Sequence, residues 1–139
     1  MKGIEFYKFL KKFYSNCDLS FQQIITTVYR PFYVPLDHII KYIKKDSHIL
    51  DIGTGSGLLL YLSQEFIGIK DSFGYDLNSN SIALAKKANI HTHINFYNSE
   101  INEEVYDLID TITIIDVIHH VPLEDKYDFL DNILKHIKA

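Results

Sequence analysis

Three glycines alternate along the chain directly after a short apolar run, and this feature constrains the fold more than any other. The segment reads Ile49-Leu50-Asp51-Ile52-Gly53-Thr54-Gly55-Ser56-Gly57. Glycine tolerates positive φ and close approach of a ligand, and a following helix offers free N–H groups at its positive end. The segment therefore predicts a buried strand, a ligand-binding turn and a helix. A turn that merely joins strand to helix is disfavoured, because three glycines cost conformational entropy.

The chain from Ser47 onward alternates short apolar runs, ended by glycine or aspartate, with stretches of helical periodicity. Such alternation is typical of an α/β fold in which helices cover a parallel sheet. We therefore expect strands at 48–52, 72–76, 93–96 and 106–115, and helices at 57–65, 79–88 and 123–137.

The residues before this pattern predict an N-terminal helical segment. Apolar residues between 4 and 14 recur at spacings of three and four with lysines between them, which indicates an amphipathic helix. A second helix is expected from Ser20, an N-cap candidate, to about Tyr29, because Pro31 and Pro35 then disfavour helical geometry. A third helix follows the second of these prolines.

Composition narrows the class of protein. The 139 residues suffice for one core, and a net charge of −4 argues against nucleic acid as a partner. Cys17 is the only cysteine, which excludes an internal disulfide and a multi-thiolate zinc site and suits a reducing cytosol. His91 and His93 could share a strand face, but no third ligand is evident, so we expect no metal site. With no signal peptide and no membrane-spanning run, a cytoplasmic protein without membrane contact is expected.

The spacing of the glycines tells nucleotide-binding loops apart. In the dinucleotide pattern G-x-G-x-x-G/A, the last position would fall on Leu58 or Leu60, and no lysine of a phosphate-binding loop lies between Lys45 and Lys70. Asp76 ends the next predicted strand, 19 residues after Gly57. An acid at that place can accept hydrogen bonds from both hydroxyls of a ribose.

These motifs together resemble the class I S-adenosylmethionine-dependent methyltransferases. The resemblance rests on the segments 49–57, 74–78, 106–109 and 116–122, in the family's order and with similar gaps, and covers about residues 36–139. It implies a three-layer Rossmann-like fold with a mostly parallel sheet, in which the strands of this chain have the order 3-2-1-4.

The resemblance also implies S-adenosylmethionine as the cofactor. Asp51, Gly53 and Gly55 would hold its methionine end, and Gly57 would let the first helix pack closely. Asp76 would bind the ribose hydroxyls. The remaining residues that we assign to the cofactor site are Thr54 in the glycine loop, Leu77 against the adenine, and Asn98, Ser99 and Glu100, where the family often has an aspartate that meets the adenine amino group.

Three polar residues after the fourth predicted strand are candidates for catalysis. Asp116, His119 and His120 would face the crevice at the carboxyl ends of the strands, and histidine can act as a base near neutral pH. Adjacent residues on a helical turn point about 100° apart, so at most one histidine should reach an acceptor. Packing or capping of the pocket is the alternative role for all three.

The chain is short for the fold that it resembles. Residues 36–139 would form a cofactor-binding domain that lacks the family's C-terminal strands, and residues 1–35 would pack on or cover the cofactor site. The far edge of the fourth strand would then lack a partner. Exposed edge strands recruit other chains, so we expect a homodimer or another association through that strand and the last helix.

The function expected on these grounds is methyl transfer from S-adenosylmethionine to an unidentified acceptor, with a small molecule favoured. Two alternatives remain open at this point. One is a non-catalytic S-adenosylmethionine-binding or interaction module, and the other is an NAD-type nucleotide-binding protein, which the glycine spacing disfavours.

Overall fold

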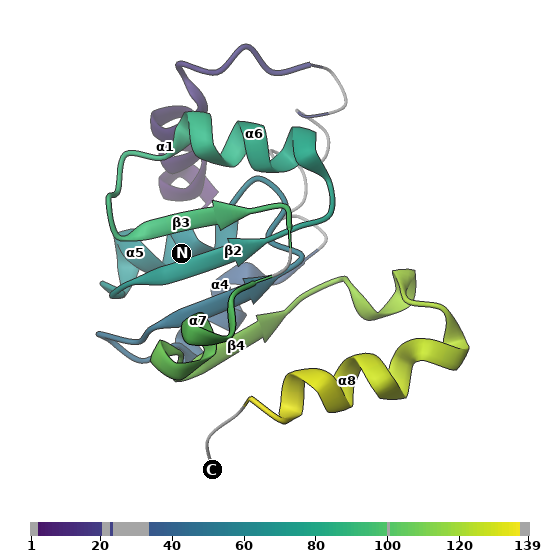
Figure 1. The fold of residues 1–139 in the computed structure, drawn as a ribbon. Coiled ribbons are helices and arrows are strands. Elements are labelled where there is room, and N and C mark those ends of the chain that lie inside the picture. Colours follow the sequence, from purple (N-terminus) through teal and green to yellow (C-terminus); the bar gives the residue numbers. More distant parts are fainter. Residues whose placement is uncertain (1–2, 21–22, 24–33, 100, 137–139) are drawn as a thin grey trace.

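The structure, a computed structural model, describes residues 3–20, 23, 34–99 and 101–136. Its centre is a parallel sheet of four strands in the order β3-β2-β1-β4 (Figure 1). The predicted fold class and strand order are confirmed. The strands are β1 (Ile49–Ile52), β2 (Ser72–Tyr75), β3 (Ile94–Tyr97) and β4 (Thr111–Ile114).

Strand β1 lies between β2 and β4, and all four of its residues are buried. Its last residue, Ile52, pairs with Tyr75 of β2 and Ile114 of β4. Three strands therefore end in register. The loops that follow them leave the sheet at one common edge, which is where ligands bind in open α/β sheets.

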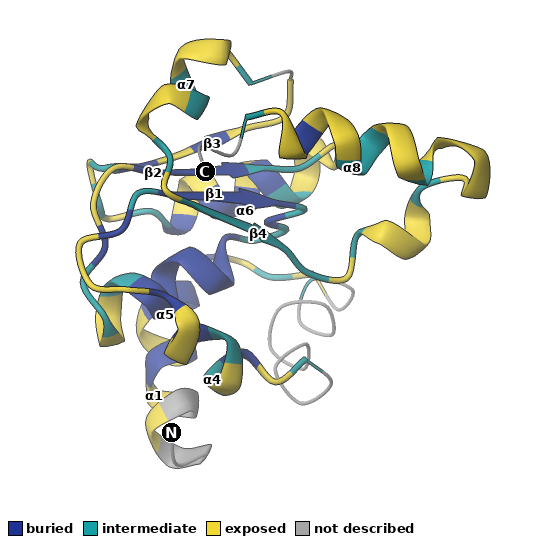
Figure 2. Cartoon of the chain, turned by 90° about the horizontal axis from the view of Figure 1, so that it is seen from below, coloured by how far each residue is buried: buried dark blue, intermediate teal, exposed yellow. Residues whose placement is uncertain are grey.

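Helices cover both faces of the sheet and complete a three-layer fold. One face carries α1 (Gly3–Tyr14), α4 (Leu36–Ile39), the adjoining 3₁₀ turn η1 (Ile40–Tyr42), α5 (Leu58–Phe66) and α6 (Ser79–Ala88). The other face carries α7 (Glu103–Leu108) and α8 (Lys126–Leu134). Figure 2 shows α1, α4 and α5 on one side of the strands, with α7 and α8 on the other.

The larger hydrophobic core is built around Tyr61 of α5, whose side chain is fully buried. Its hydroxyl donates a 2.5 Å hydrogen bond to the backbone carbonyl of Ala85 in α6. Phe13 of α1 stacks on its ring with a centroid distance of 5.0 Å. One residue thus ties three helices together beneath the sheet.

The expectation of one strand over 106–115 is wrong in its first half. Residues 103–108 form α7, and β4 begins only at Thr111. The Asn102 side chain accepts a hydrogen bond from the Glu104 N–H, and Glu103 and Glu104 lie in the first turn, where acidic residues stabilise a helix. The cap and this favourable charge select a helix for a segment whose apolar residues also suit a strand.

The N-terminal helix is confirmed, and the second predicted helix lies largely outside the described residues. At its expected start, the Ser20 hydroxyl accepts from the Gln23 N–H at 3.3 Å, and Gln23 Oε1 accepts from the Ser20 N–H at 2.9 Å. This reciprocal pair is a capping box. The last helix is shorter than expected, since 123–125 form a 3₁₀ turn, η3, before α8. Within the described ranges, no helix has the length and apolar character needed to cross a membrane.

Candidate functional site

The glycine loop joins β1 to α5 and needs glycine at each of its three alternating positions. Gly53, Gly55 and Gly57 have φ values of 76°, 57° and 81°, a region that side chains disfavour. The N–H groups of Gly53 and Thr54 both donate to the Tyr75 carbonyl, at 2.8 and 3.0 Å. The loop therefore folds back over the end of β2.

Close neighbours add a second reason for glycine in this loop. A Cβ atom at Gly53 would collide with Cγ2 of Val117, which follows β4. A Cβ atom at Gly57 would lie 2.6 Å from the Phe96 ring of β3 and 3.1 Å from the Tyr61 ring. The close packing expected at Gly57 therefore involves a strand of the sheet as well as the first helix after the loop.

Asp76 stands at the end of β2, next to the glycine loop. Its Oδ2 accepts a 2.8 Å hydrogen bond from the Gly55 N–H, and its Oδ1 accepts one of 2.8 Å from the Asn78 N–H. Asn78 in turn caps α6 through the N–H groups of Asn80 and Ser81. A carboxylate has about four acceptor sites, so Asp76 retains capacity for ligand hydroxyls while it holds the loop.

Two of the predicted loop residues lie behind the surface that a ligand would meet. Asp51 is 3% exposed, and its Oδ1 accepts a 2.7 Å hydrogen bond from the Thr113 hydroxyl of β4. The Thr54 hydroxyl is buried, has no hydrogen-bond partner among the described residues, and lies 2.8 Å from where a Cβ of Gly74 would be. Asp51 therefore links β1 to β4, and neither side chain belongs to the described cavity wall.

A cavity of about 1410 Å³ opens at the carboxyl ends of the strands. Its described walls come from the segment after α1, the glycine loop, the end of β2 with α6, the segment after β4, and α8. They comprise Cys17, Asp18, Ser20, Gln23, Val34, Ile52, Gly53, Gly55, Ser56, Tyr75, Asp76, Leu77, Asn78, Asn80, Ser81, Ala83, Leu84, Lys87, Asp116, Val117, His120, Val121, Pro122 and Phe129.

The structure brings together about half of the residues that the sequence assigned to the site. Gly53, Gly55, Asp76, Leu77, Asp116 and His120 line the cavity. Leu77 is 82% exposed there and presents an apolar surface beside Asp76. The wall so described does not include Asp51, Thr54, Gly57, Asn98, Ser99 or His119, and Glu100 lies outside the described residues.

The two candidate histidines lie side by side in the segment after β4 but differ in their position relative to the cavity. Asp116 has a φ of 60°, which is rare for a residue with a side chain, and its Oδ1 lies 3.3 Å from Nδ1 of His119. His119 and His120 belong to a 3₁₀ turn, η2 (Ile118–His120), with ring centroids 3.8 Å apart. Of the two, it is His120 that lines the cavity. His120 is therefore the histidine of the pair that could touch a molecule in the cavity.

Sequence reasoning missed several wall residues. Cys17 and Asp18 follow α1, and Val117 covers Gly53. Phe129 of α8 packs against a smaller hydrophobic cluster and also borders the cavity; the buried members of that cluster are Leu50, Ile52, Phe73 and Ile133. Val117 lies in the 116–122 segment of the resemblance, but its contact with Gly53 does not follow from that motif. Cys17, Asp18 and Phe129 belong to no motif, so only the folded chain could reveal them.

Comparison with known proteins agrees with this geometry. Residues 30–139 match the sequence model of a family described as a methyltransferase domain. A ribosomal protein L11 methyltransferase from Dictyoglomus turgidum is 34% identical over 77 residues, which are 55% of this chain and 24% of that protein. The match therefore spans about a quarter of the relative's length.

Two solved structures that contain S-adenosyl-L-homocysteine share the fold. A SAM-dependent methyltransferase from Thiobacillus denitrificans, in complex with S-adenosyl-L-homocysteine, superposes with a TM-score of 0.61 at 17% identity, over 88% of this chain and 53% of that one. A mycolic acid cyclopropane synthase complexed with S-adenosyl-L-homocysteine gives a TM-score of 0.64 at 15% identity, over 86% of this chain and 43% of that one. The chain thus spans about half the length of these proteins.

Proposed function

The chain belongs to the methyltransferase domain family, within the class I S-adenosylmethionine-dependent methyltransferases, and from that premise we propose that it binds S-adenosylmethionine in this cavity and transfers the methyl group to an acceptor. The observation that carries the proposal is the Asp76 carboxylate, 2.8 Å from the Gly55 N–H. The Asp76 carboxylate would therefore lie beside the ribose, and it also fixes the loop that would meet the methionine end.

The residues present fit such a cofactor. The positive φ values of Gly53 and Gly55 bring bare backbone to the cavity surface. Asp76 has acceptor capacity for two hydroxyls, and the exposed Leu77 beside it offers an apolar contact for a base. Polar and apolar groups therefore occur in the order that a nucleoside with a charged tail requires.

The chemistry needs little from the protein beyond placement. When bound, S-adenosylmethionine supplies a methyl group on a positively charged sulfur; the bond from methyl to acceptor forms as the bond from methyl to sulfur breaks, leaving S-adenosylhomocysteine. This chain would hold the donor at the loop and at Asp76, and His120 on the cavity wall would take the proton that the acceptor loses. Asp116 and His119 would shape the turn that carries His120.

We propose further that the acceptor is a small molecule and that the protein acts in the cytoplasm. We also propose that it forms a homodimer, or another association, through the edge of β4 and through α8. The association is supported by the position of β4 at one edge of the sheet and by Tyr127 and Leu134 of α8, which are 80% and 58% exposed. Sedimentation over a range of concentrations tests it. A monomer at every concentration would refute the homodimer.

Calorimetric titration with S-adenosylmethionine, S-adenosylhomocysteine and NAD tests the cofactor proposal. We expect both sulfur compounds to bind and NAD not to bind; preferential binding of NAD would refute the proposal. Release of S-adenosylhomocysteine in a panel of small-molecule acceptors then tests catalysis. Tight binding without turnover on any acceptor would favour the non-catalytic binding module.

A further inference from the structure

The last residue of α1 contacts the glycine loop. The Tyr14 hydroxyl donates a 3.1 Å hydrogen bond to the Ser56 carbonyl and lies 3.4 Å from the Ser56 hydroxyl oxygen. Ser56 stands between Gly55 and Gly57 and lines the cavity. A residue 42 positions earlier in the chain therefore reaches the centre of the candidate cofactor loop.

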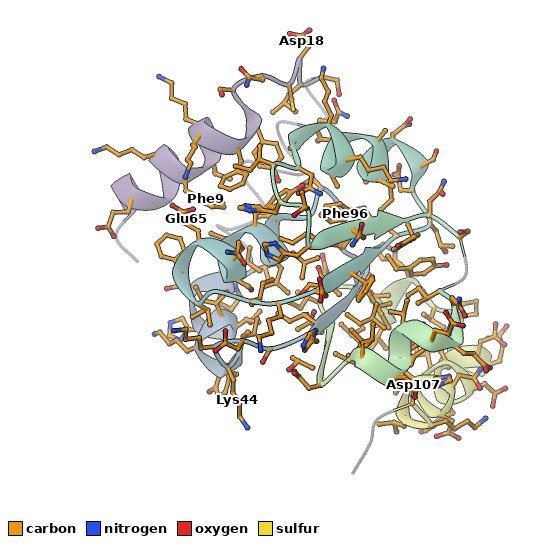
Figure 3. The ribbon with its side chains drawn as sticks, turned by 60° about the vertical axis from the view of Figure 1, so that its left-hand side comes forward. Phe9, Asp18, Lys44, Glu65, Phe96 and Asp107 are labelled. Carbon is orange, nitrogen blue, oxygen red and sulfur yellow. The ribbon has the colours of Figure 1, made fainter. Side chains whose placement is uncertain are left out.

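Packing fixes the place of this hydroxyl. Tyr14 is 5% exposed and meets the Tyr61 ring edge-on at 6.5 Å. Burial raises the pKa of the Tyr14 phenol, so the group remains a neutral donor throughout the physiological range. Figure 3 shows Phe9 and Glu65 where α1 crosses α5, and there Lys12 Nζ lies 3.3 Å from Glu65 Oε2. Helix α1 is thus held to the helix that begins at the loop.

The loop itself has few restraints at Ser56. In the part of the chain that the structure describes, the N–H groups of the loop that donate hydrogen bonds are those of Gly53, Thr54, Gly55 and Gly57, and their acceptors are Tyr75, Asp76 and Thr54. Glycine on both sides of Ser56 leaves this peptide with wide rotational freedom. The bond from Tyr14 restrains the Ser56 carbonyl from outside the loop.

The end of α1 also leads into the cavity wall. The Cys17 N–H donates to the Tyr14 carbonyl at 3.1 Å, which turns the chain so that Cys17 and Asp18 border the cavity. Tyr14 therefore contacts the loop through its hydroxyl, and its backbone carbonyl holds the turn that carries Cys17 and Asp18.

We infer that Tyr14 is a positioning residue of the cofactor site, which sets the orientation of the Ser56 peptide and makes α1 a part of cofactor binding. The inference rests on the proposed function for its ligand. On this inference, the N-terminal helix contributes to cofactor binding as well as to the hydrophobic core. Loss of the Tyr14 hydroxyl should therefore lower cofactor affinity without removing any group from the cavity wall.

The test compares two buried tyrosines that differ in what they hold. Tyr14→Phe removes the hydroxyl on Ser56, and Tyr61→Phe removes the hydroxyl on the Ala85 carbonyl, away from the loop. We expect Tyr14→Phe to weaken S-adenosylhomocysteine binding about five- to tenfold by calorimetry, the effect of one hydrogen bond. Tyr61→Phe should change affinity less than twofold, even if it lowers the melting temperature by as much as Tyr14→Phe does.

Hydrogen exchange of the free protein provides a second measurement. Tyr14→Phe should accelerate amide exchange in residues 53–57, and Tyr61→Phe should not. Equal effects of the two substitutions on affinity and on loop exchange would overturn the inference, and so would no effect of Tyr14→Phe on either. If the wild type binds no S-adenosylhomocysteine, the proposed function fails, while the exchange comparison still decides the role of Tyr14.

Discussion

Asp76 and Gly55 are joined by a 2.8 Å hydrogen bond from the Gly55 N–H to the carboxylate Oδ2. The bond links the end of β2 to the loop that leaves β1, so two segments 21 residues apart form one surface. Because the acid both holds the loop and faces the cavity, a change at Asp76 should act on loop order and on ligand binding together.

Substitution of Gly53 should destabilise the protein more than its backbone conformation alone requires. Gly53→Ala places a side chain at positive φ, which costs about 1 to 2 kcal/mol, and also drives its Cβ into Val117. S-adenosylhomocysteine affinity should fall as well, because Val117 lines the cavity. Urea unfolding and calorimetry measure the two effects.

Gly68→Ala is the matched control for that substitution. Gly68 has a φ of 78°, close to the 76° of Gly53, but apart from its two neighbours in the chain a Cβ there would meet no atom of the described residues within 4 Å. It should show the backbone cost alone and leave ligand affinity unchanged. Equal losses of stability in the two variants would contradict the role assigned to Val117.

Removal of the Thr113 hydroxyl should weaken the contact between β4 and β1, the strand that leads into the glycine loop. Thr113→Val removes the 2.7 Å hydrogen bond that the Thr113 hydroxyl donates to the carboxylate of the buried Asp51. This loss should lower the free energy of unfolding by about 1 to 3 kcal/mol. Thr111→Val, on the same strand, takes a similar bond from the exposed Asp110 and should cost less. A larger loss at Thr111 in urea unfolding would refute this ranking.

The stability of the folded protein should fall in acid because of His91. Burial, followed by repulsion from His93, lowers the pKa of His91 below its usual 6.5; Glu65 opposes the shift and Lys12 adds to it. As pH drops below 6.5, the unfolded chain therefore takes up this proton before the folded protein does. Stability should decline from about pH 7 to pH 5, and His91→Gln should make the decline shallower. An unchanged slope of the urea midpoint against pH would contradict this.

The parts of the fold that local patterns encode could be predicted from the sequence. Alternating glycines after an apolar run gave the turn from β1 to α5, and Asp76 at the end of the next apolar run gave the neighbouring site residue. Helix α7 was missed because Tyr106 and Leu108 also suit a strand; the decisive signal was the cap at Asn102, followed by two glutamates.

The contacts that complete the site are non-local, and no local pattern encodes them. Val117 over Gly53 and Tyr14 on Ser56 join segments that only the folded sheet and helix α1 bring together. The described cavity wall also includes His120 and not His119, a choice that sequence spacing left open between the two. Motifs could therefore locate the glycine loop, while the contacts that hold it required the structure.

The dissociation constant of S-adenosylhomocysteine for the wild type, Asp76→Ala and Asp71→Ala tests the central claim most directly. Asp71 is an exposed aspartate just before the other end of β2 and serves as the control. Asp76→Ala should weaken binding by about 2 to 4 kcal/mol, because paired hydrogen bonds to ribose hydroxyls are lost, and Asp71→Ala should leave binding unchanged. An affinity that survives the loss of Asp76 would place the ribose elsewhere and contradict the account.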